Sequence, residues 1–91
     1  MNSNTIAAQR ARLAEAIEDG ELLRVEMGEA MTLDGDEVPW RARIRPLGFV
    51  RSAQGERLKC EVEAEDLYMM VNEEQCDGVK HWLLGSFQIL E

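Results

Sequence analysis

Apolar residues in this chain change their spacing near residue 20. Upstream of that point Ile6, Leu13 and Ile17 fall on one stripe at helical spacing. This spacing predicts a helix over residues 4–18. We expect the helix to dock its stripe on a sheet, with dimerisation through the stripe as the alternative interpretation.

Both ends of this helix carry capping residues. Ser3, Asn4 and Thr5 precede the stripe, and their side-chain oxygens can accept hydrogen bonds from the amides of the first turn. Gly20 follows the last helical position, where a left-handed backbone suits glycine. The caps therefore bound the helix on both sides.

After the helix the spacing of apolar residues becomes two, which is typical of β-strands. Residues 21–27 alternate first, and residues 38–45 alternate again, with Trp40 on one face and three arginines on the other. Between these segments, Asp34-Gly35 favours a tight hairpin turn because both residues tolerate positive φ. Pro46 lacks an amide donor, so it ends the second strand or sits at an edge or a bulge.

The clearest alternation comes next. Residues 48–50 continue extended into a turn at Gln54-Gly55, and a strand with charged residues on its outer face follows. Its inward positions are Leu58, Cys60, Val62 and Ala64.

Towards the C-terminus the pattern is less regular. Residues 66–71 form a short apolar run that fits both a strand and a short helix. A polar loop over 72–78 follows it. The tail, 80–90, predicts one or two short strands interrupted by Gly85-Ser86.

These elements predict one domain of the α+β class over residues 1–91, with a helix in 1–20 and a β-rich barrel in 21–91. The N-terminal helix is expected to pack on a small antiparallel β-barrel or strongly bent sheet of five to six short strands. The predicted core consists of Ile17, Leu23, Val25, Trp40, Ile44, Leu47, Phe49, Leu58, Val62, Trp82, Leu84 and Ile89.

Composition agrees with a folded domain. Hydrophobic residues make up 45% of the 91 residues, although the formal net charge is −8. No apolar run approaches the roughly 20 residues that a membrane helix needs, and we expect a cytoplasmic protein without membrane contact. Cys60 and Cys76 lack the spacing of a zinc site. In a cytoplasmic protein we expect reduced thiols, with a disulfide between them as the alternative.

Charge is distributed unevenly. Residues 41–60 carry one acid, Glu56, and six bases, whereas residues 61–78 carry seven acids and no base. The two groups either pair across a sheet or face different partners. The candidate binding residues for nucleic acid or a ligand are Arg41, Arg43, Arg45 and Arg51, and the candidate acidic face for a protein partner is formed by Glu61, Glu63, Glu65, Asp66, Glu73 and Glu74.

Pairing is the simpler explanation of the arginines. Three guanidinium groups on one strand face could follow phosphates. The whole-molecule charge repels a polyanion, however, and Trp40 points the other way. We therefore expect the arginines to pair with Glu61, Glu63 and Glu65 on a neighbouring strand.

Catalysis has little support in the sequence. His81 is the only histidine, and no serine stands in a nucleophile-elbow motif. Cys60 lies at an inward strand position, where a thiol packs rather than reacts. We expect no enzyme, no cofactor, no metal ion and no catalytic residue.

The order of segments resembles the WYL domain. The matching stretches are "AIEDGELLRVEM", "RIRPLGFV", "GERLKCEV" and "GVKHWLLGSF", within residues 14–90. The matched features are Ala16-Ile17, the segment Arg45, Pro46, Leu47 and Gly48, and the closing Lys80, Trp82 and Phe87.

This resemblance implies an SH3- or Sm-like barrel of a kind found in bacterial transcription regulators and in short stand-alone proteins. The family's namesake Trp-Tyr-Leu would lie near residues 57–59, where Arg, Leu and Lys stand instead. Leu83 or Ser86 replaces the arginine that is usual in the closing strand. Because these positions are implicated in ligand or nucleic-acid sensing, the barrel can carry over without that binding function.

Two functions follow as expectations. The first is a non-enzymatic regulatory or binding module that senses a ligand or binds nucleic acid or protein. The alternative is a small acidic inhibitor of phage type, like the anti-CRISPR proteins, that blocks a nucleic-acid-binding groove of its partner. A protein partner is expected in both cases, nucleic acid is possible in the first, and the oligomeric state stays open.

Overall fold

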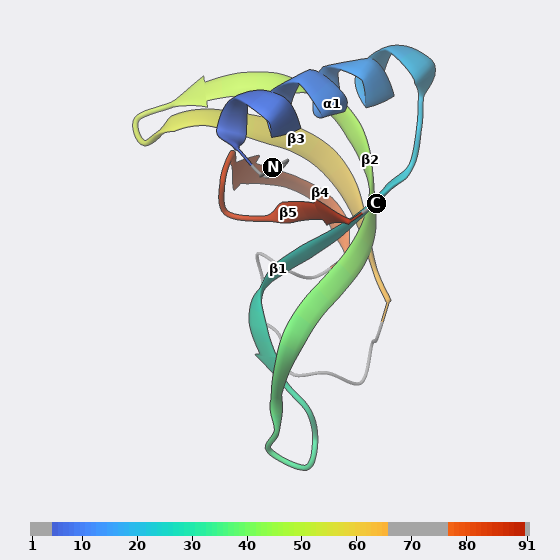
Figure 1. Cartoon of the computed structure of the whole chain (residues 1–91), viewed down its shortest axis with the longest axis vertical. Helices are drawn as coiled ribbons and strands as arrows, with labels where there is room; N and C mark the ends of the chain where they lie inside the picture. Colours follow the sequence, from blue (N-terminus) through green and yellow to red (C-terminus); the bar gives the residue numbers. More distant parts are fainter. Residues whose placement is uncertain (1–4, 66–76, 91) are drawn as a thin grey trace.

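The computed structural model describes residues 5–65 and 77–90, which form one helix and five strands (Figure 1). The elements in chain order are α1 (Ile6–Asp19), β1 (Leu23–Met31), β2 (Glu37–Ser52), β3 (Gly55–Ala64), β4 (Gly78–Leu83) and β5 (Gln88–Leu90). The α+β class is therefore confirmed for this part of the chain. The predicted alternatives for 66–71, and Asp66, Glu73 and Glu74 of the acidic face, lie outside the described residues.

Helix α1 begins and ends at the predicted caps. Thr5 is the N-cap, and its hydroxyl oxygen accepts a hydrogen bond of 3.2 Å from the amide of Ala8. Gly20 adopts the left-handed conformation, with φ of 64°, and its amide donates to the carbonyl of Ala16. The predicted helix and its C-terminal glycine are both confirmed.

The strands form one antiparallel sheet in the order β4-β3-β2-β1-β5. The sheet is strongly curved, and α1 lies across one end of it (Figure 1). Its two edges, β4 and β5, are consecutive in the chain but form no ladder with each other. Within the described residues the sheet is therefore open, and a closed barrel is not formed.

Strand β2 is the long central strand that shapes the sheet. It pairs with β1 through residues 37–44 and with β3 through residues 42–52. The register with β3 shifts between Pro46 and Gly48, which places a bulge at Leu47. A bulge bends a strand and increases its twist, so the two halves of β2 can belong to differently oriented parts of the sheet.

Pro46 does not end the strand. It lies directly before the bulge at Leu47, so the alternative prediction, a bulge at the proline, is correct. The paired segment of β1 begins at Leu23, opposite Ile44, so β2 has passed the end of its β1 neighbour at Pro46. The missing amide donor of proline therefore removes no bond of that ladder. Leu47 follows the outward direction of Arg45 and is 40% exposed, so its predicted place in the core is wrong.

The core lies between α1 and the inner face of the sheet. Trp82 connects its two other large aromatics, with ring centroids 5.9 Å from Trp40 and 5.5 Å from Phe87. Seven of the predicted core residues are buried, and four more are partly buried and pack against them. Phe87 is also buried, but the sequence analysis did not predict it in the core. The seven are Leu23, Val25, Trp40, Ile44, Leu58, Val62 and Trp82, and the four are Ile17, Phe49, Leu84 and Ile89.

Gln9 on α1 is a buried polar residue, 3% exposed, that occupies the free edge of β5. Its amide nitrogen donates to the carbonyl of Phe87, and its amide oxygen accepts from the amide of Ile89, both at 3.0 Å. The carbonyl of Phe87 and the amide of Ile89 are therefore directed away from β1. A helix side chain therefore satisfies backbone groups that a neighbouring strand would bind in a closed barrel.

Candidate functional site

The three candidate arginines of β2 share the outer face of the sheet. Their neighbours along the strand, Ala42 and Ile44, are fully buried. Because side chains alternate between the two faces of a strand, Arg41, Arg43 and Arg45 are directed outward. The row predicted from the sequence is therefore present.

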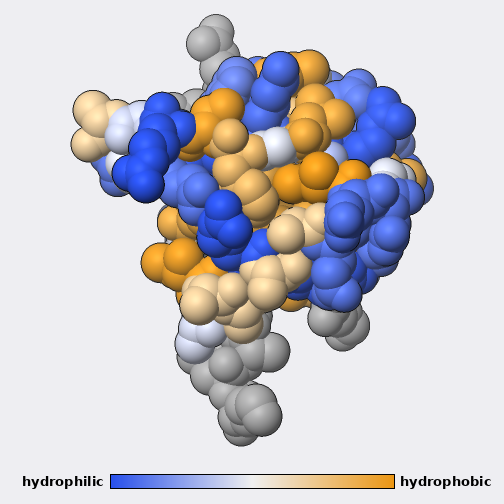
Figure 2. Space-filling view, turned by 90° about the horizontal axis from the view of Figure 1, so that it is seen from above, coloured by the Kyte–Doolittle hydropathy of each residue, from blue (hydrophilic) through white to orange (hydrophobic). Residues whose placement is uncertain are grey.

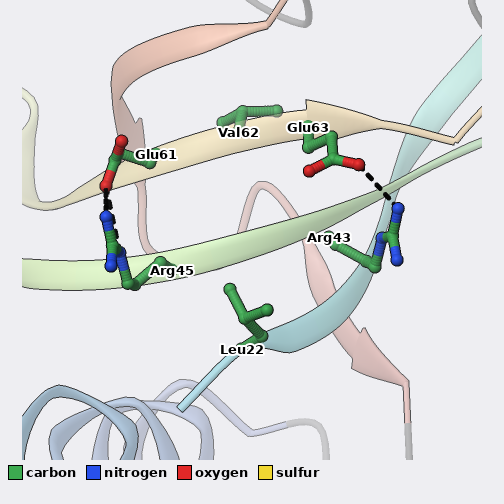
Figure 3. Close-up of a pocket in the computed structure, with 6 residues that line it drawn as sticks. All are labelled: Leu22, Arg43, Arg45, Glu61, Val62 and Glu63. Carbon is green, nitrogen blue, oxygen red and sulfur yellow. Dashed lines mark hydrogen bonds and ion pairs between the residues drawn. The ribbon is translucent and has the colours of Figure 1, made fainter. Parts of the chain in front are cut away.

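Carboxylates of β3 neutralise two of these arginines. Arg43 pairs with Glu63 at 2.6 Å, and Arg45 pairs with Glu61 (Figure 3). Each pair joins residues directly opposite one another in the β2–β3 register. Cross-strand pairing of opposite charges, as expected from the sequence, is confirmed at these two positions.

Arg41 finds a different partner from the predicted one. Its guanidinium lies 3.3 Å from the carboxylate of Glu26 on β1, and Glu65 pairs instead with Arg24 at 2.5 Å. The hydrogen bonds from Arg24 lower the pKa of Glu65, and those to Glu65 raise the pKa of Arg24. Because Glu26 and Arg24 were not considered, the sequence analysis missed both pairs.

These four pairs lie at neighbouring positions of β1, β2 and β3, with Glu65 just after β3, and we call them together the charge network. It contains four arginines and four glutamates and carries no net charge at neutral pH. Its members are Arg24, Arg41, Arg43, Arg45, Glu26, Glu61, Glu63 and Glu65.

A shallow depression of about 220 Å³ lies between two pairs of this network. The Arg45–Glu61 pair flanks one side and the Arg43–Glu63 pair the other, and Leu22, just before β1, lines the depression as well (Figure 3). Pockets for small molecules usually measure roughly 300–1,000 Å³. The depression is smaller than that and suits a single side chain of a partner better than a cofactor.

Arg51, the fourth candidate, stands near the end of β2, opposite Glu56. The carboxylate of Glu56 is bound by Arg10 of α1, with hydrogen bonds of 2.8 and 3.1 Å. These bonds lower the pKa of Glu56, and the charge of Arg51 lowers it slightly further. Arg10 also lies 4.2 Å above the ring of Phe49, a contact that the sequence did not reveal.

A second group of cations lies nearer the β2–β3 turn. Lys59 is exposed and, among the residues that the structure describes, forms no ion pair. Arg57 donates to the carbonyl of His81 and to Gln54 but binds no carboxylate there. Together with three exposed apolar neighbours they form what we call the basic patch: Leu47, Val50, Arg57, Lys59 and Val79.

Exposed apolar groups are not confined to that patch. Viewed from the α1 end, hydrophobic areas of the surface lie between hydrophilic ones (Figure 2). The exposed large apolar residues are Ile6, Leu22, Met31, Leu33, Leu47, Val50 and Val79.

Acidic groups outside the charge network gather at the β1–β2 hairpin. Asp34, Asp36 and Glu37 are exposed and form no ion pair within the described ranges. Met31 and Leu33 beside them are 43% and 75% exposed. We call these five residues the acidic tip, which the sequence analysis treated only as a turn.

The described side chains include one cysteine. Cys60 is a buried free thiol, and burial raises its pKa to about 12. Over residues 5–65 and 77–90, no three His, Cys, Asp or Glu side chains are grouped to hold a metal ion. In the described part of the chain, no helix combines the length and the apolarity that crossing a membrane requires.

Comparison with known proteins gives no match. No family model, no curated protein and no solved structure matches this chain. The WYL resemblance therefore stays a prediction from the sequence, and function is argued from the surface alone.

Proposed function

We propose that this protein is a non-enzymatic binding module that recognises another protein. The observation that carries the proposal is the charge network, because it occupies the arginines that a phosphate backbone would need. A regulatory role of the WYL type remains part of the proposal, supported by the resemblance and by the curved sheet with its single helix.

Nucleic acid is a poorer partner for the same surface. To contact phosphates, Arg43 and Arg45 would have to leave Glu63 and Glu61, which are already hydrogen-bonded to them. The carboxylates of Glu61 and Glu63, once released, would then repel the phosphates at close range. Association also depends on long-range steering, and a protein of charge −8 repels a polyanion.

An acidic inhibitor is the second candidate function, and the acidic tip favours it. The tip presents Asp34, Asp36 and Glu37 on a protruding hairpin, away from α1 (Figure 1). Carboxylates in this position could enter a basic groove of a partner that normally binds nucleic acid. Leu33 would add apolar contact at the centre of such an interface.

Gel-shift titrations with single-stranded DNA and RNA at about 50 mM salt test the choice between protein and nucleic acid. Phosphate contacts are strong at this salt concentration, and we expect no retarded complex. A complex that disappears in the Arg43→Glu variant would contradict the proposal and would restore the arginine row as a nucleic-acid site.

Capture from a bacterial lysate tests the inhibitor function. The bait is the intact protein, compared with Asp34→Lys/Asp36→Lys and with Glu15→Lys, a single charge reversal on the exposed side of α1. An inhibitor acting through the tip should lose a nucleic-acid-binding partner only in the double variant. Retention of every partner by that variant would eliminate the tip as the inhibitory surface.

A further inference from the structure

Strand β2 carries complementary surfaces at its two ends. Its first residue, Glu37, belongs to the acidic tip, and Val50, near its last residue, belongs to the basic patch. The tip combines three carboxylates with two exposed apolar side chains, whereas the patch combines two cations with three exposed apolar side chains. Each surface therefore offers the charge that the other lacks, together with apolar area to bury.

Hydrogen bonds fix the shape of the acidic tip. The amide of Thr32 donates to the carbonyl of Asp36, and the amide of Gly35 donates to the carbonyl of Thr32. The hydroxyl oxygen of Thr32 also accepts from the amide of Asp36 at 3.1 Å. A loop held in this way loses little conformational entropy on binding, which favours its use as a contact.

Strand register places the members of the basic patch close to one another on the outer face. In the β2–β3 register Val50 lies opposite Arg57, and Gly48, next to the bulged Leu47, lies opposite Lys59. Val79 of β4 extends the patch on the far side of β3, where it lies opposite Glu61. The carboxylate of Glu61 is bound to Arg45, so the patch keeps its positive charge.

One molecule cannot bring its own two surfaces together. The β1–β2 hairpin lies at one end of the longest axis, and the β2–β3 turn lies near the opposite end (Figure 1). That axis measures 39 Å, and β2 runs as one hydrogen-bonded strand between the two turns. The complement of each surface must therefore come from another molecule.

We propose that the acidic tip of one copy of this chain docks on the basic patch of a second copy. Asp34 and Asp36 would face Lys59 and Arg57, and Leu33 would pack among the apolar residues of the patch. The contact is heterologous, so each copy keeps one open surface after pairing and the assembly can grow head to tail. This goes beyond the proposed function and does not require it, because the occupant is the chain itself.

The net charge of −8 limits the strength of this association. Copies repel one another at long range, but the Debye length is about 8 Å at 0.15 M salt, so distant charges are screened. Contacts at the interface remain, because they act over shorter distances. We therefore expect dissociation constants on the order of 10–100 µM at this salt concentration, near the weak end of specific association.

Sedimentation velocity at 0.15 M salt and 10–500 µM protein tests the proposal with two variants and a control. The tip variant is Asp34→Lys/Asp36→Lys, and the patch variant is Lys59→Glu/Val79→Asp. The control is Glu15→Lys, an exposed charge reversal outside both surfaces. The wild type and the control should associate as concentration rises, and each variant alone should stay monomeric with an unchanged circular dichroism spectrum.

Mixing the two variants gives the decisive measurement. The patch variant keeps an intact tip and the tip variant keeps an intact patch, so together they should form a 1:1 dimer that grows no further. A monomeric wild type at 500 µM would overturn the proposal. Association that persists in either variant alone, or variants that fail to dimerise while the wild type associates, would overturn it as well.

Discussion

At the scale of single residues, Gln9 connects the helix to the sheet. It is the only buried polar or charged residue in the described ranges, and both ends of its side-chain amide bind the backbone of β5. A short edge strand of three residues has few bonds of its own. Gln9 therefore stabilises the C-terminal edge and covers it against pairing with other chains.

Replacement of Gln9 by leucine should destabilise the protein by about 1–3 kcal/mol. The substitution leaves the carbonyl of Phe87 and the amide of Ile89 without their partner in a buried site. Urea denaturation followed by circular dichroism measures the change. The control is Gln88→Leu at an exposed position of β5, and an equal loss in both variants would contradict the role of Gln9.

At the scale of the elements, the bulge in β2 decides which residues face the core. Without it, alternation continued from Ile44 would give odd-numbered residues the outward direction throughout the strand. The register shift after Pro46 reverses this order, so Phe49 packs against the core and Val50 lies outside. Leu47 itself keeps the outward direction that the alternation from Ile44 gives it.

The different burial of two leucines on neighbouring strands predicts unequal effects of their replacement. Leu47→Ser should change stability by less than about 0.5 kcal/mol, as is usual for surface substitutions. Leu58→Ala should cost about 2–5 kcal/mol, because Leu58 is completely buried and its loss leaves a cavity. Denaturant melts of both variants check this, and a large loss at Leu47 would show that it packs in the core after all.

At the scale of the whole molecule, ion pairs tie distant elements together. Arg10 of α1 binds Glu56 of β3, and Arg24 of β1 reaches past β2 to Glu65, just after β3. Arginine lowers the pKa of both carboxylates from about 4.5. A lowered carboxylate pKa stabilises the fold above pH 4.5, and the stabilisation is lost as the pH falls through the lowered value.

Glu65→Gln should therefore lower the melting temperature by a few degrees at pH 7, the size typical of a surface pair. The difference from the wild type should shrink below pH 4.5 and vanish at still lower pH, once Glu65 is protonated in both the folded and the unfolded state. Thermal melts at half-unit pH intervals measure this difference. A gap that stayed constant down to pH 2 would mean that the ion pair contributes nothing.

Local patterns in the sequence were sufficient for the secondary structure of residues 5–65 and 77–90 and for most of the core there. Capping residues placed α1, Asp34-Gly35 placed the first hairpin, and the alternation in β3 placed its buried face, because each signal involves neighbouring residues. The pairing of Arg43 with Glu63 also followed, once two strands of opposite charge were expected to be neighbours. Arg10 and Gln9 could not be assigned in this way, since their partners are 46 and 78–80 residues away.

The sequence by itself determined the kinds of elements, their order and the presence of two oppositely charged strands, because propensity and periodicity act over short distances. Tertiary structure decided that the sheet stays open, that Gln9 covers its edge and that the bulge turns Val50 outward. It also decided that Arg41 pairs with Glu26 and that Glu65 pairs with Arg24. Those outcomes depend on which distant strands become neighbours, and that is fixed only when the whole chain packs around one core.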